Sequence, residues 1–78
     1  MAVQSTLLSQ LPAGARGVIE ALPEDEDLRD ELAALRMLPG QAVEVVQTLP
    51  MGGPLLVSAG GGLYALGRTV AERVRVLA

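Results

Sequence analysis

The sequence predicts a small all-β domain with one inserted α-helix, and three observations favour this fold class. Outside one segment, short apolar runs alternate with polar residues, which is the period of half-buried β-strands. Residues 26–36 instead carry apolar side chains at intervals of three and four, which is the period of an amphipathic helix. With 78 residues, the chain is expected to form a single domain, 1–78, because it has no room for a second core.

The first predicted strand covers residues 16–21 and follows a turn that contains proline and glycine. In this strand we expect Val18 to face the core. Ala21 or Leu22 joins it there if a bulge shifts the alternation.

The helix predicted over 26–36 begins in an acidic run. Its apolar stripe, with spacings of four and three residues, consists of Leu28, Leu32 and Leu35. Asp25 or Asp27 is expected to cap the N-terminus, where acids also suit the positive end of the helix dipole. Pro39 and Gly40 then stop the helix and turn the chain.

Four short strands are expected in quick succession after the helix, over 42–48, 54–59, 62–67 and 73–77. Strands this close together cannot be joined by parallel crossovers, so they must pair as antiparallel hairpins. The side chains expected to point inward are Val43, Val45, Val74 and Val76. About five strands with one buried face are expected to close into a small antiparallel barrel, because closure removes exposed edges.

The stretch "PMGGPLLVSAGGGLY", residues 50–64, holds five of the nine glycines and raises the question of a phosphate site. A phosphate cradle needs a strand, then glycines, then a helix whose first amides point at the phosphate. Here both glycine clusters run into β-like segments, and the chain has no lysine. The glycines therefore predict hairpin turns, where they supply positive φ angles at no steric cost.

The composition argues against an enzyme and against a metal or cofactor site. The chain has no histidine, cysteine or lysine, so its serines and threonines have no partner to activate them. The same absence removes the soft and imidazole metal ligands, and we expect no tight Fe²⁺ or zinc site. Carboxylates of the acidic run point apart along one helical turn, which disfavours a cation cage.

The charge balance excludes further classes of partner. The net charge is −3, and six of the nine acids fall within 24–31, whereas duplex-binding domains are normally basic on one face. Tyr64 is the single aromatic residue, too few for a base-stacking platform. No apolar run approaches the roughly 18 residues of a membrane span, and the N-terminus lacks a secretory pattern. We expect a soluble cytoplasmic protein with no nucleic-acid partner and no direct membrane insertion.

Three motifs in their order and spacing resemble the FeoA family, the small cytoplasmic component of bacterial ferrous-iron uptake. They are "LAALRMLPG", "LPMGGPLLV" and "LYALGRTVAERVRV", and the resemblance extends from about Leu11 to Leu77. It implies an SH3-like barrel with an inserted helix. It also implies a non-enzymatic role beside FeoB, the membrane iron permease with a cytoplasmic GTPase domain.

Several positions depart from the pattern of that family. Glu31 and Gly67 stand where arginine is common, Arg36 where glycine is common, and Gly52, Gly53 and Pro54 where Gly-Asp-Pro is frequent. A glycine that ends a helix usually adopts the left-handed conformation, which arginine enters at some cost. Either this helix ends differently, or Arg36 is strained.

The surface expected to bind a partner is the loop 49–54 with part of the next hairpin strand. The candidate residues are Leu49, Met51, Gly52, Gly53, Tyr64 and Leu66. A loop this apolar is costly to leave in water unless it is covered, and methionine is common at adaptable interfaces. Tyr64 and Leu66 share a strand face and are expected to continue the patch, whereas Leu49 alternatively caps the barrel mouth.

Two functions remain open from the sequence. In the first, the partner is FeoB, or a second copy of the chain in a homo-oligomer. The alternative is a free-standing SH3-like regulatory or protein-interaction module, related to the C-terminal domain of iron-dependent repressors. A groove for proline-rich peptides would need several aromatic side chains, which one tyrosine cannot supply.

Overall fold

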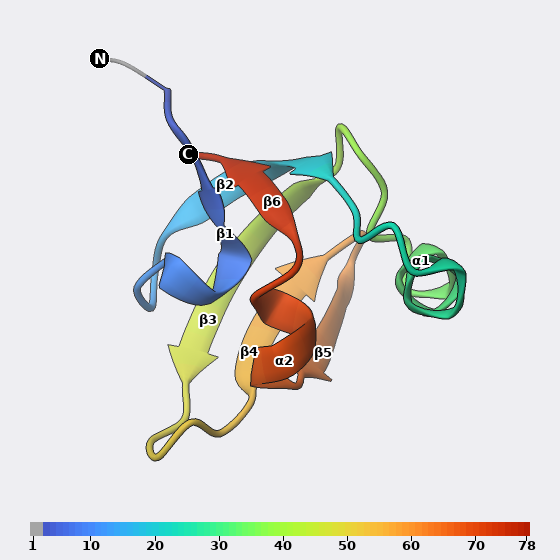
Figure 1. Ribbon diagram of the computed structural model, residues 1–78. Coiled ribbons are helices and arrows are strands. Elements are labelled where there is room, and N and C mark those ends of the chain that lie inside the picture. Colours follow the sequence, from blue (N-terminus) through green and yellow to red (C-terminus); the bar gives the residue numbers. More distant parts are fainter. Residues whose placement is uncertain (1–2) are drawn as a thin grey trace.

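The computed structural model describes residues 3–78 and contains one antiparallel sheet of six strands (Figure 1). The strands are β1 (Ser5–Leu7), β2 (Arg16–Ala21), β3 (Ala42–Thr48), β4 (Leu55–Ala59), β5 (Gly62–Leu66) and β6 (Arg75–Leu77). They lie in the order β1-β6-β2-β3-β4-β5, and every neighbouring pair is antiparallel. Helix α1 (Glu26–Ala34) joins β2 to β3, α2 (Arg68–Ala71) joins β5 to β6, and a 3₁₀ turn covers Leu8–Gln10.

The predicted all-β fold with one inserted helix is confirmed, and the five predicted strands all form, with ends that differ by at most two residues. Two details were wrong. A sixth strand, β1, pairs with β6, and the sheet does not close into a barrel, because β1 and β5 stand at its two edges. Three-residue strands such as β1 offer few free backbone groups, so this edge is blunted by its shortness rather than by closure.

The prediction that Val18 faces the core was also wrong. Val18 is 40% exposed, whereas its neighbour Ile19 is 1% exposed and pairs with Val76 of β6. A bulge does occur, but it lies between Ile19 and Ala21, where the register against β6 shifts. Ala21 is consequently exposed and Leu22 half-buried.

The core is a single apolar cluster to which the sheet, α1 and α2 all contribute buried side chains. It includes Val43, Val45, Val74 and Val76, as predicted, and β4 contributes alternate residues of its run. Its most deeply buried large side chains are Leu8, Ile19, Leu32, Met37, Val45, Leu55, Val57, Val74 and Val76. Among residues 3–78 no polar or charged side chain is buried, so the fold is held by apolar packing and the backbone ladder.

Helix α1 has a capped N-terminus and a strained C-terminal turn. The Leu28 N–H donates to Asp25 Oδ1 at 3.1 Å, which is the expected cap. At the other end Arg36 has φ 63°, so it adopts the left-handed conformation usually taken by glycine. Its N–H donates to the Ala33 carbonyl at 2.9 Å, and the Met37 N–H donates to the Leu32 carbonyl at 2.9 Å.

These two hydrogen bonds form a Schellman motif, which closes the helix and returns the chain to the core. Met37 and Leu32, the two residues joined by the longer-range bond, are both fully buried, as this motif favours. The question raised by the sequence is thereby resolved: the helix ends in the ordinary way, and Arg36 is strained.

Candidate partner-binding surface

The loop between β3 and β4, Leu49–Pro54, forms a narrow projection from the lower corner of the sheet (Figure 1). The Leu49 N–H donates to the Pro54 carbonyl at 3.2 Å, and the Gly53 N–H donates to the Pro50 carbonyl at 3.1 Å. Met51 and Gly52, the two central residues of this inner turn, have φ angles of 60° and 72°. Positive φ at both positions is the arrangement of a type I′ hairpin turn.

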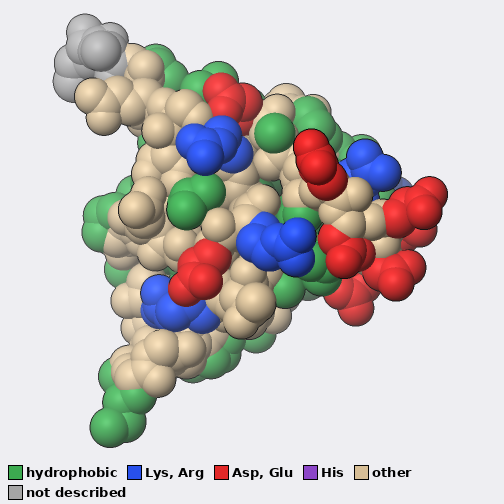
Figure 2. Space-filling model, viewed as in Figure 1, with side chains coloured by type: hydrophobic (Ala, Val, Ile, Leu, Met, Phe, Trp, Pro, Cys, Tyr) green, Lys and Arg blue, Asp and Glu red, His purple; other side chains and the backbone are tan. Residues whose placement is uncertain are grey.

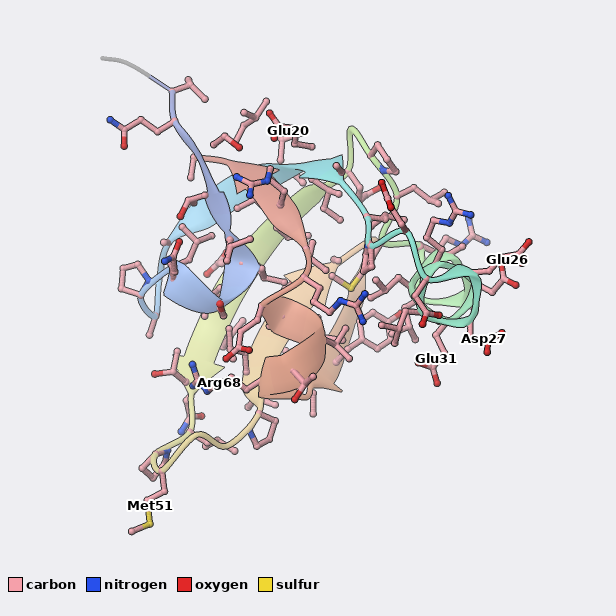
Figure 3. The ribbon with its side chains drawn as sticks, in the orientation of Figure 1. Glu20, Glu26, Asp27, Glu31, Met51 and Arg68 are labelled. Atoms are coloured by element: carbon pink, nitrogen blue, oxygen red, sulfur yellow. The ribbon has the colours of Figure 1, made fainter. Side chains whose placement is uncertain are left out.

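Met51 combines an unfavourable backbone with a fully exposed apolar side chain. The first central position of a type I′ turn favours asparagine, aspartate or glycine. For an ordinary L-residue, the left-handed conformation costs about 1–2 kcal/mol of conformational free energy. The relative exposure of Met51 is 103%, and its side chain points away from the molecule (Figure 3). Met51 therefore gains no packing within its own chain that offsets the strain.

The other predicted site residues divide between the loop and the core. Leu49 is half-buried, and a side chain at Gly53 would approach the Pro50 carbonyl and Leu49 within about 3 Å, which explains a glycine there. Tyr64 is half-buried and packs on the core, with its ring over Gly62. Leu66 is only 5% exposed. The shared face of Tyr64 and Leu66 thus turns inward and does not extend the exposed surface of the loop.

A second surface feature, which the sequence does not predict, is an apolar groove between α1, β5 and α2. Its volume is about 390 Å³, and its walls include Glu31, Leu32, Ala34, Leu35, Leu66 and Val70. The stripe of leucines on α1 was the sequence signal for this groove. The core covers only part of the stripe, because Leu32 is buried but Leu35 is only half-buried. We call this feature the α1–β5 groove.

Charge is distributed unevenly between α1 and the remainder of the chain. Residues 24–31 carry six acids and one arginine, a net charge of −5, whereas the rest carries five arginines and three acids, a net charge of +2. Figure 2 shows the acidic side chains gathered over α1 and the basic ones spread across the rest of this face. The molecule is therefore strongly dipolar, with its negative end at α1.

The described residues contain no candidate metal site. Across 3–78, no three side chains of the ligand-forming types lie close enough to hold a metal ion. The one ion pair found there joins Arg16 Nε to Glu44 Oε1 at 3.1 Å, on the surface of neighbouring strands β2 and β3. No helix in the described part of the chain has the length and apolarity of a membrane span.

A small, mainly β domain with an antiparallel sheet and an inserted helix belongs to the SH3-like class of folds. The model of the FeoA domain matches residues 6–78, and the chain is a member of the FeoA family. No curated protein sequence matches the chain significantly.

Solved FeoA structures share this fold. A FeoA described as an iron uptake regulatory protein is 30% identical, with a TM-score of 0.87 and coverage of 95% of this chain and 97% of that one. FeoA from Chlorobium tepidum is 29% identical, with a TM-score of 0.85 and coverage of 92% and 69%. The zinc complex of Stenotrophomonas maltophilia FeoA, described as an SH3 domain protein, is 32% identical, with a TM-score of 0.78 and coverage of 91% and 88%.

The same fold occurs within larger metal-responsive regulators. A manganese-dependent transcriptional repressor superposes with a TM-score of 0.88 at 15% identity, and this chain covers 44% of its length. At that identity the likeness shows the fold alone.

Proposed function

We propose that the protein is a non-enzymatic accessory component of bacterial ferrous-iron uptake that acts in the cytoplasm, where it binds and modulates the GTPase-bearing permease FeoB. Membership of the FeoA family supports the transport role. The Stenotrophomonas maltophilia relative is described as a candidate activating factor of ferrous iron transport. The absence of histidine, cysteine and lysine supports a role in binding rather than in chemistry.

The position and exposure of Met51 are the observations that support this loop as the partner-binding surface. An exposed methionine in a left-handed turn position lowers the stability of the free protein, and any of the residues that suit a type I′ turn would remove that cost. Strain that the fold does not require is typical of functional sites. Because methionine is unbranched and adaptable, it suits an anchor that enters an apolar pocket of FeoB.

The test is a titration of the cytoplasmic domain of FeoB with the wild-type protein and with Met51→Asp. Aspartate tolerates the left-handed region, so the variant is expected to remain folded while its affinity falls by about tenfold or more, as for the loss of an interface anchor. Leu63→Asp is the matched control, since Leu63 is also apolar and 61% exposed but lies on β5 rather than in the loop.

The control variant is expected to bind FeoB as the wild-type protein does. Equal binding by Met51→Asp and wild type would remove the loop from the interface. Absence of any binding by the wild-type protein would instead favour the alternative, a free-standing regulatory module with another partner.

A further inference from the structure

We propose that the turn at the end of the β3–β4 loop of one molecule docks into the α1–β5 groove of a second copy, so that the protein self-associates head to tail. The docking element is Pro50–Gly52, with Met51 at its end, and we call it the Met51 turn. This contact does not depend on the proposed binding of FeoB. It follows from the complementarity of two different surfaces, the Met51 turn and the α1–β5 groove, in shape and in charge.

The first complementary feature is shape and polarity. The Met51 turn is narrow, and its methionine is fully exposed on a strained backbone. The α1–β5 groove is lined mainly by aliphatic side chains and, at about 390 Å³, is roomy enough for one long aliphatic side chain. A flexible, unbranched methionine fills irregular apolar space well. Docking would remove both exposed apolar surfaces from water at once.

The second complementary feature is charge. The groove is bordered by Glu31, and Asp27 lies one turn earlier on the same side of α1 (Figure 3). At the other surface, the pairing of Leu55 with Leu66 places the start of α2 at the same end of the sheet as the loop. Arg68 is the first residue of α2, its side chain is half-buried, and it lies on the side of α2 nearer the loop (Figure 3).

An acid-bordered apolar groove thus matches an apolar turn that has an arginine nearby. Glu72 lies one helical turn beyond Arg68, but within residues 3–78 the two do not form an ion pair. The match is therefore between the net −5 of the acidic segment on one copy and a cation on the next.

The two features cannot meet within one molecule. The Met51 turn projects from the free end of the β3–β4 hairpin, whereas α1 lies at the opposite side of the sheet beyond β5 (Figure 1). A contact between two different surfaces of identical chains is heterologous, and each added copy leaves one turn and one groove free. Because one turn buries little area, we expect weak association that grows with concentration.

The experiment is sedimentation equilibrium from micromolar to millimolar protein, with one variant for each surface. Met51→Gly removes the anchoring side chain and suits the turn conformation. Ala34→Lys places a long cationic side chain in the groove, and Ala34 is exposed and lies in α1, so the helix tolerates it. Ala33→Lys is the matched control, because Ala33 is exposed on the same helix but does not line the groove.

We expect the average mass of the wild-type protein and of Ala33→Lys to rise with concentration and to fall again as salt is added. Each of the other two variants alone is expected to stay monomeric. Their equimolar mixture is expected to form dimers and nothing larger, because it contains one intact turn and one intact groove per pair.

A wild-type protein that remains monomeric at millimolar concentration would overturn the proposal. So would self-association that survives in either variant alone, or a mixture that stays monomeric. Binding of FeoB is measured separately. A protein that does not self-associate can still bind FeoB, and a protein that does not bind FeoB can still self-associate, so the two proposals fail independently.

Discussion

Two residues of this protein, Arg36 and Met51, occupy the same disfavoured region of backbone conformation, and their surroundings differ sharply. Both have φ near 60°, and neither is glycine. Arg36 closes a Schellman motif, two hydrogen bonds satisfy the helix end, and its Cβ lies 3.1 Å from the position that a Cβ on Gly60 would occupy. Met51 has only the turn hydrogen bond around it and a side chain in water.

Equal backbone strain at these two residues therefore has different origins. At Arg36 the fold demands a left-handed residue, because the helix must end there for Met37 to reach the core. At Met51 the fold also demands a left-handed residue, but it does not demand a methionine. The identity of Met51 is what the structure leaves unexplained, and partner binding is the explanation that we propose.

The largest expected effect comes from removing the packing that holds the strained helix end. Leu32→Ala deletes the buried partner of Met37 in the Schellman motif and is expected to lower the free energy of unfolding by about 2–5 kcal/mol. Urea denaturation measures this change. Leu63→Ala serves as the control, because Leu63 is exposed, and it should cost less than about 0.5 kcal/mol. A loss that small for Leu32→Ala would mean that the helix end does not depend on its core contact.

A smaller effect is expected at the turn that packs against Arg36. Gly60→Ala places a side chain at φ 56° and against the Arg36 Cβ, and we expect a loss of about 1–2 kcal/mol or somewhat more. In the Arg36→Gly background the contact is absent, so the loss at Gly60 should shrink. Gly61→Ala is the control, since φ is 84° there but no atom lies within 4 Å. Its cost should be the same in both backgrounds, and equal shrinkage at both glycines would contradict the packing account.

The smallest expected change in stability separates the two strained residues directly. Asparagine tolerates the left-handed region, so Met51→Asn should raise the free energy of unfolding by about 1 kcal/mol. For a domain of this size, that corresponds to a midpoint about 4–8 °C higher in thermal unfolding. Arg36→Asn should gain less, because it also loses the packing of Arg36 on the β4–β5 turn. A midpoint that falls for Met51→Asn would show that Met51 contributes to folding after all.

The sequence predicted the elements well because their signals are local. Alternating valines in β3 and β6 and the spaced leucines of α1 fix both the period and the buried face. Val18 was misplaced because β2 carries apolar residues on both of its faces, Val18 on one and Ile19 on the other, and the alternation does not say which of the two is buried. The first strand, β1, has three residues and no measurable period, so only its pairing with β6 reveals it.

The candidate site was less predictable, since its decisive properties are three-dimensional. The glycines marked a turn around Met51, but only the backbone shows that methionine itself carries the positive φ. Leu66 was assigned to the surface because β5, unlike β3 and β6, carries apolar side chains on both faces, so its sequence does not say which face is buried. The α1–β5 groove depends on the distance between a helix and an edge strand, which no spacing in the sequence encodes.

The most direct test of the central claim measures stability and binding on one variant, Met51→Asn. If Met51 is retained for a partner, this substitution should raise the unfolding midpoint and weaken binding to the cytoplasmic domain of FeoB in the same preparation. Opposite signs of the two changes are the predicted result. A Met51→Asn protein that is more stable and binds FeoB with unchanged affinity would contradict the account.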